Sequence, residues 1–246
     1  MNTTQAAVPP RSGLATAVDV VIAPTQAFER LRVAPTWGWA FLIAVVLGMV
    51  GFALTIPAAL HALQVGGPAL FASSPQFQNL PADKQQQAIS NALAFTRVIT
   101  QLQWIFVPIV MLIGSLIGTV VMLIANAIAH GEGTFKKLWA LSINVGIVSV
   151  GIGLLLTGII CVVRGPASFT STTDVQRALP SLALFAGSAG VKMKTFLAAF
   201  NVVQLWGTAL LGLGMQGVAR IGAPVAWGTA IVMLVGSAAI GASFAR

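Results

Sequence analysis

Charge is scarce in this sequence, and five long stretches contain none. The 246 residues include 13 Lys and Arg and 5 Asp and Glu, all outside residues 37–60, 103–129, 138–163, 196–218 and 221–245. Because a helix crosses the ~30 Å hydrocarbon core in roughly 20 residues, each stretch is long enough to span a membrane. The alternating segments typical of barrel strands are missing. The sequence therefore predicts an all-α polytopic membrane protein, a five-transmembrane-helix bundle with interfacial amphipathic helices.

Cysteine and tyrosine are scarce or absent, and the basic residues are scattered. The single cysteine, Cys161, lies inside the third stretch, so no internal disulfide can form. Tyrosine is absent, so tryptophans such as Trp37 and Trp139 are expected to anchor the spans at the membrane surface by themselves. The net charge of +8 comes from basic residues that form no cluster longer than Lys136-Lys137. We therefore expect these residues to meet the headgroups of the lipid bilayer, and we expect no nucleic acid partner.

Reactive motifs are also missing. The sequence has no GxSxG, HExxH or GxxxxGK[ST] pattern, so hydrolysis and phosphate binding have no recognisable site. Gly212, Gly214 and Gly217 match the dinucleotide pattern GxGxxG, but they end an apolar helix and follow no strand, which indicates close helix packing. His61 and His130 have no Cys, Asp or Glu at ligand spacing. We expect no enzyme activity, cofactor or metal site.

A short N-terminal segment precedes the membrane domain. Residues 1–36 are predicted to be soluble or interfacial, with a disordered start at residues 1–13 and two short helices at Leu14–Ile22 and Thr25–Arg32. Residues 37–246 are predicted to form the five-span domain, with the charge-free stretches as its spans. Because nothing resembles a signal peptide, the first span is expected to act as an uncleaved signal-anchor.

The connection between the first two spans, residues 61–102, is the longest. Its second half predicts an amphipathic helix over Asp83–Leu102, capped by Asp83 and Gln86 and with Phe95 on its protected apolar face. We expect this helix to run into the second span and to lie on the membrane or to cap the bundle.

The later connections are simpler. The third connection, residues 164–195, contains a capping pattern at Thr173 and Gln176 and an apolar run at Leu182–Ala186, which is too short to span and fits an interfacial or re-entrant segment. Only a few residues around Arg220 separate the fourth and fifth charge-free stretches. These two stretches are therefore predicted to form a helical hairpin.

Polar amides inside the spans are candidate functional residues. An amide without a partner is costly in hydrocarbon, so Asn126, Asn144, Asn201 and Gln204 should face the bundle interior and bond across helices. Alternatively they line a polar path for a solute, and Asn201 and Gln204, three residues apart, are the best candidates for that role. No ionisable residue of the kind that couples transport to ions lies within a span.

Small residues recur four apart within the spans, as at Gly114 and Gly118. Helices in lipid gain no hydrophobic driving force when they meet, so such positions let backbones approach and pack by dispersion. We expect Gly114 and Gly118 to pack against other helices of the same bundle. Homodimerisation is the alternative.

The chain resembles a bacterial member of the Yip-domain family, membrane proteins named for interaction with Ypt/Rab GTPases. The resemblance depends on the order and spacing of "VIAPTQAFERLRVAPTWGWAF", "HGEGTFKKLWAL" and "FLAAFNVVQLWGTALLGLGMQGVAR", and it covers about residues 18–245. It implies a helical bundle with a cytoplasmic N-terminus. The chain lacks the acidic N-terminal region and the Tyr-Gly-Pro-type motif of eukaryotic members, so binding of a Rab-type GTPase is in doubt.

Together these features favour a non-enzymatic membrane adaptor or organiser that contacts other membrane proteins or a second copy of itself. The alternatives are a small channel or permease subunit and, third, an enzyme that acts on lipids. Arg30 and Arg32 closely precede the first span, whereas residues 61–79 have no basic residue. By the positive-inside rule we expect a cytoplasmic N-terminus, in a bacterial plasma or inner membrane.

Overall fold

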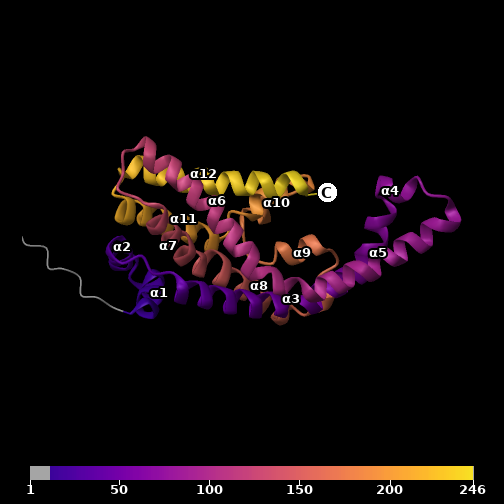
Figure 1. The fold of residues 1–246 in the computed structure, drawn as a ribbon. Coiled ribbons are helices and arrows are strands. Elements are labelled where there is room, and N and C mark those ends of the chain that lie inside the picture. The colour runs from indigo at the N-terminus through magenta and orange to yellow at the C-terminus, as the bar shows by residue number, and fades with distance from the viewer. Residues whose placement is uncertain (1–11, 246) are drawn as a thin grey trace, which may run out of the picture.

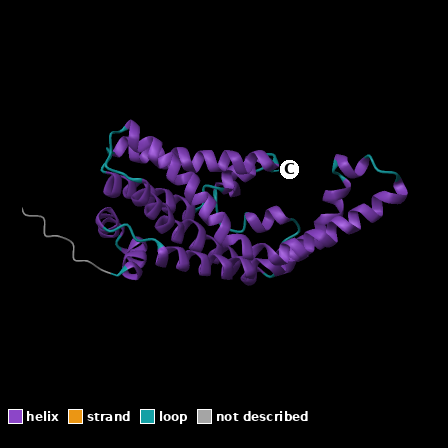
Figure 2. Cartoon of the chain, in the orientation of Figure 1, coloured by secondary structure: helices purple, strands orange, loops and turns teal. Residues whose placement is uncertain are grey.

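The protein is built from helices alone. The computed structural model describes residues 12–245, and within them the chain forms helices and loops without a named strand (Figure 2). Most of the segment expected to be disordered, residues 1–13, lies outside the described residues. The α-helices are α1 (Gly13–Ile22), α2 (Pro24–Val33), α3 (Gly38–Ala72), α4 (Pro75–Gln78), α5 (Ala82–Leu102), α6 (Val107–Ile128), α7 (Phe135–Gly146), α8 (Gly153–Arg164), α9 (Thr172–Gln176), α10 (Val191–Ala198), α11 (Val202–Ala219) and α12 (Ala223–Phe244).

Five helical segments of the described chain are long and apolar enough to cross a membrane, which confirms the predicted all-α multi-pass architecture. The second segment joins α5 to α6 through the 3₁₀ turn η1 (Gln103–Phe106), and the third joins α7 to α8 through the π-helical turn η2 (Ile147–Ile152). Two helices have other limits than the predicted spans. The first helix continues to Ala72, so His61 lies within it, and the fourth begins at Val202.

The extension of α3 forms a hairpin with α5 that projects past the bundle, and we call residues 61–102 the arm (Figure 1). Helix α5 packs along α3, so it does not cap the bundle as one expectation held. Phe95 is 67% exposed, because Ala92, Leu93 and Thr96 lie on the side that meets α3. The predicted cap is also wrong: α5 begins after Pro81, and no side chain caps it.

The two predicted N-terminal helices are present, and they pack onto one end of the bundle. Phe28 and Leu31 of α2 are fully buried in the main core, against α7 and α11. The side chains of Asp19 in α1 and Arg30 in α2 form a buried ion pair, which joins the two helices. This N-terminal unit therefore belongs to the packed core as well as to the surface.

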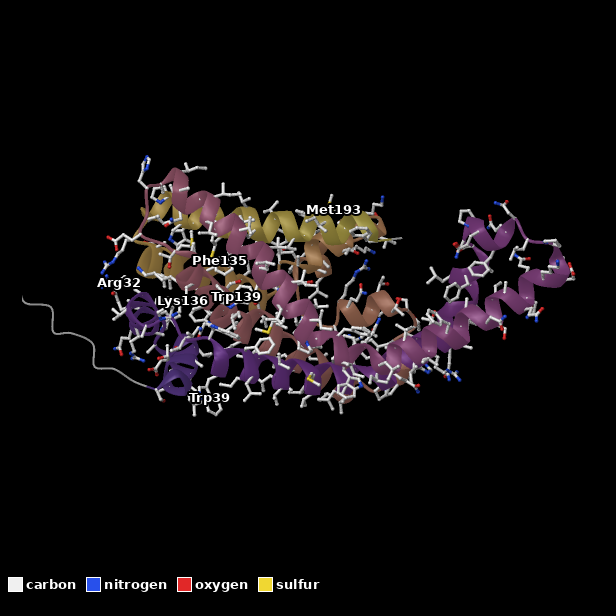
Figure 3. The ribbon with its side chains drawn as sticks, viewed as in Figure 1. Arg32, Trp39, Phe135, Lys136, Trp139 and Met193 are labelled. Carbon is white, nitrogen blue, oxygen red and sulfur yellow. The ribbon has the colours of Figure 1, made fainter. Side chains whose placement is uncertain are left out.

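We call this end of the bundle the closed end and the opposite end the open end. The closed end carries α1, α2 and the α6–α7 and α11–α12 turns, and the open end carries α9, α10 and the arm (Figure 1). Phe135 stacks on Trp139 at the closed end, with ring centroids 6.0 Å apart, and Trp37 meets Trp139 edge-on. Arg32 and Lys136 lie at the same end (Figure 3). This mixture of aromatic and basic side chains is typical of a membrane–water boundary.

The loop between α8 and α11 differs from one expectation. The capping box of α9 is formed by Ser171 and Asp174 instead of Thr173 and Gln176. The apolar run Leu182–Ala186 contains a 3₁₀ turn, η4 (Leu182–Phe185), in which Phe185 is 85% exposed. Arg177 reaches across this loop and donates to the backbone oxygen of Val191 (3.1 Å) and the hydroxyl of Thr195 (2.9 Å), so it holds α10 in place.

Candidate functional site: a groove between α6 and α12

The space beside each glycine of the dinucleotide pattern is occupied by a side chain of another helix, and three different helices supply these side chains. A Cβ at Gly212 would lie 2.9 Å from the ring of Trp227, and one at Gly217 would lie 3.0 Å from Phe28. At Gly214 it would overlap Leu141. These glycines therefore let α11 sit tightly among α12, α2 and α7, as the packing interpretation requires.

The closest helix crossing was missed by the sequence analysis. A Cβ at Gly51 of α3 would overlap the backbone at Leu154 and Leu155 of α8, and one at Gly158 would overlap the backbone oxygen of Gly51. The sequence offered a signal for this close crossing. Gly151 and Gly158 are seven residues apart, which is about two helical turns, so they lie on the same face of the helix. The crossing fixes α8, and with it the π turn, against the first long helix.

Helices α6 and α12 touch at one level and separate beyond it. A Cβ at Gly118 would lie 3.0 Å from the Met233 Cε and 3.4 Å from the Ser142 Oγ, so Gly118 is at a helix contact. A Cβ at Gly114, one turn nearer the open end, would meet no atom of another helix within 4 Å in the described chain. The packing expectation therefore fails at Gly114, because α6 has already diverged from α12 there.

The space left by this divergence is a groove of about 790 Å³. Its walls come from α6 and α12, and its floor from α7, η2 and α11. Most lining side chains are apolar, among them Val110, Met111, Leu211, Met233 and Leu234. Figure 1 shows α6 running obliquely away from α12 toward the open end. The groove lies within the membrane-spanning part of the molecule.

Three of the hydroxyl groups that line the groove bond to their own helices. Thr208, Ser149 and Ser237 each donate their hydroxyl to a backbone oxygen three or four residues earlier, at 2.8, 3.4 and 2.9 Å. Such back-bonding satisfies the donor in an apolar environment. Gln204 also lines the groove. Ser149 belongs to the π turn, and turns of this type are frequent at functional sites.

Three of the four candidate amides lie elsewhere. Asn126 closes the α6–α7 turn, since its side chain accepts from the backbone of Gly133 (2.8 Å) and donates to the oxygen of the same residue (3.0 Å). Asn144 donates to the backbone oxygens of Thr36 (2.9 Å) and Ala140 (2.8 Å) and so ties α7 to the start of the first span. The structure does not bring these two amides together with the groove.

Asn201 lies at the start of the fourth span instead of within it. Its side chain accepts from the backbone N–H of Gln204 (3.0 Å) and donates to the oxygen of Ala198 (3.2 Å), which makes it the N-cap of α11. Capping by Asn satisfies one of the orphan donors of a helix start. The pair singled out as a possible solute path is therefore a cap and one groove residue.

A second hollow, of about 500 Å³, lies in the arm between α3 and α5. Its lining mixes Leu63 and Leu93 with polar residues such as Gln64, Gln86 and Arg97. In the described part of the chain, no three His, Cys, Asp or Glu side chains come together in a way that could hold a metal ion.

Outside the spans, the carboxylate of Asp174 has a shifted pKa. Burial raises its pKa, but hydrogen bonds from the hydroxyl and backbone of Ser171 and of Thr170 outweigh burial, and the pKa lies below its ordinary value. This carboxylate caps α9 and is remote in sequence from the groove residues. Comparison of the chain with family models, curated proteins and solved structures gives no match.

Proposed function

We propose that this protein is a non-enzymatic membrane adaptor or organiser of the Yip-domain type. The observation that carries the proposal is the use of the amides: Asn126, Asn144 and Asn201 hold turns and helix ends. A channel or permease subunit would instead need a polar path across the bundle. The groove ends where Gly118 meets Met233, and the hydroxyls of Ser149, Thr208 and Ser237 bond back to their own helices, so both features favour the adaptor over the channel.

The arm supports an organising role. It carries α5 past the end of the bundle, and Val65, Leu70, Phe95 and Val98 are each at least half exposed on it (Figure 1). We propose that the arm contacts another membrane protein beside the bundle. The basic residues before the first span and the Yip-type layout support a cytoplasmic N-terminus in a bacterial inner membrane, with the arm on the opposite side.

Site-specific photo-crosslinking in native membranes tests the adaptor role. A photoreactive residue at Phe95 should give discrete protein adducts, whereas one at Val232, exposed on α12, should give lipid adducts only. Protein adducts absent from the arm, together with solute flux through the purified protein in liposomes, would favour the channel.

Fusions at the C-terminus test the orientation. Because five spans place the two termini on opposite sides, a fused alkaline phosphatase should be active and a fused fluorescent protein that matures only in the cytoplasm should stay dark. The reverse pair of results would place the N-terminus outside.

A further inference from the structure

The part of the groove that follows α6 is about one membrane leaflet deep. It reaches from Val107 to the contact at Gly118, and this distance is about 16 Å at a rise of 1.5 Å per residue. Beyond Val107, Phe106, Gln103 and Ile99 continue the lining toward the arm. Half of the ~30 Å hydrocarbon core has the same depth as the part along α6. This part of the groove therefore begins near the headgroups of the open-end leaflet and stops near the middle of the bilayer.

The chemistry of the walls selects an alkyl chain over water. The lining is mainly aliphatic, and three of its hydroxyls, on Ser149, Thr208 and Ser237, already donate to backbone oxygens of their own helices. Met111 and Met233 face the space from opposite walls. Methionine side chains are flexible and adapt to irregular apolar shapes, so they suit an acyl chain of variable conformation.

Positive charge lies beside the α12 wall of the groove. Helix α10 packs beside α12, and Met193 of α10 lies along the half of α12 nearest its C-terminus (Figure 3). Lys192 and Lys194 flank Met193, and α10 contains no acidic residue. Because Arg177 holds α10 through two hydrogen bonds, these lysines are held beside α12, where they can attract an anionic headgroup.

We propose that the groove binds one acyl chain of an anionic phospholipid from the leaflet at the open end, with its phosphate near Lys192 and Lys194. Two complementarities carry this assignment: an apolar slot of leaflet depth, and basic residues beside one of its walls. The site goes beyond the adaptor role and does not depend on it.

Two glycines provide a matched test of the acyl-chain site. Gly114 lines the groove, whereas Gly236 of α12 does not, and at both positions a Cβ would meet no atom of another helix within 4 Å in the described chain. The full-length protein is placed in nanodiscs that contain phosphatidylglycerol with a photoreactive diazirine on one acyl chain. We expect Gly114→Phe to reduce crosslinking to α6 and α12 roughly tenfold, and Gly236→Phe to leave it unchanged.

Equal crosslinking in the two variants, or no crosslinking of α6 and α12 in the unmodified protein, would overturn the proposal. If Gly114→Phe fails to fold, Ser237→Phe fills the groove from the opposite wall and gives the same test.

The headgroup assignment has its own test. The double variant Lys192→Gln and Lys194→Gln should lose the preference for phosphatidylglycerol over phosphatidylcholine while it still crosslinks to acyl chains. Lys84→Gln, which removes a charge on the arm, should keep the preference. A preference that survives the double variant would overturn the anionic assignment.

Discussion

The glycines of α11 and those along the groove side of the bundle are used in opposite ways. Near the closed end, a large side chain from a neighbouring helix occupies the space beside each of Gly212, Gly214 and Gly217. Toward the open end, Gly114 and Gly241 would meet no atom of another helix within 4 Å in the described chain if they carried a Cβ. Small residues therefore permit close helix packing but do not determine it, and where a facing side chain is missing they widen a groove.

Charge is also used differently at the two ends. The closed end buries the pair of Asp19 and Arg30, with side chains only 10% and 7% exposed. The lysines of α10 at the open end are more accessible, and Lys192 is exposed. A buried pair holds its partners strongly, because removing one charge leaves the other without compensation. We therefore expect the closed end to be the stable part of the molecule.

The largest expected loss of stability comes from Asp19→Ala at the closed end. The change leaves the guanidinium of Arg30 buried without its carboxylate, which typically costs about 3–5 kcal/mol. Chemical unfolding of the purified protein in detergent measures the loss. The control is Glu29→Ala, which removes the more exposed contacts to Arg32 (3.2 Å) and Arg220 (3.4 Å) and should cost less than about 1 kcal/mol. Similar losses in both variants would contradict the burial argument.

The next largest difference in stability is expected between two glycine-to-leucine variants, one near the closed end and one in the groove. Gly214→Leu forces a side chain into the space held by Leu141 and should destabilise the bundle by about 1–3 kcal/mol or more. Gly114→Leu projects into the groove and should cost far less. Thermal unfolding of both variants in the same detergent makes the comparison. A Gly114 variant as unstable as the Gly214 variant would show that the groove is closed.

A smaller effect is expected at the α6–α7 turn. Asn126→Ala removes both hydrogen bonds to the backbone of Gly133 and should destabilise the closed end by about 1–2 kcal/mol. Hydrogen exchange of residues 129–134 should speed up, whereas exchange in the loop of residues 165–175 should not change. Uniform acceleration across both loops would mean that the turn is not a local unit.

The smallest effect is a pH dependence at the open end. Because the folded-state pKa of Asp174 is lowered, its cap stabilises α9 fully above the unfolded value of about 3.8 and is lost as the pH falls through the folded value. Protection of residues 170–177 from hydrogen exchange should therefore fall in acid. In Asp174→Asn this pH dependence should disappear, whereas Asp83→Asn, at a helix start without a side-chain cap, should retain it. An unchanged acid response in Asp174→Asn would exclude this cap as the cause.

The sequence was sufficient to locate the five spans but not to place the ends of their helices. Runs without charge located five long apolar helices, because burying charge in hydrocarbon is costly. The helix limits differ from the predicted spans where apolarity continues, as in α3 beyond His61, and where a cap starts a helix later, as at Asn201. Charge-free composition cannot distinguish a helix in lipid from the same helix extended into an arm.

The candidate site could be predicted only in part. The sequence identified Gln204 as a polar residue inside a span and Gly118 as a packing position, and the structure places one in the groove and the other at its end. The groove itself depends on the angle between α6 and α12, which depends on tertiary packing such as the contacts of Met233 with Gly118 and of Trp227 with Gly212. Periodicity along one helix carries no information about how far its neighbour leans away.

The most direct test is whether the groove opens to lipid or to water. In a Cys161→Ala background, single cysteines replace Gly114 and Ser237 in the full-length protein, because Cys161 is buried and is the chain's single cysteine. In native membranes, a charged methanethiosulfonate should label neither position from either side, because a thiol in an apolar groove without water stays protonated and unreactive, whereas both positions should be labelled after the protein is unfolded in detergent. Labelling of both positions by the charged reagent would show a water-filled path and would contradict an apolar groove that is open to the bilayer.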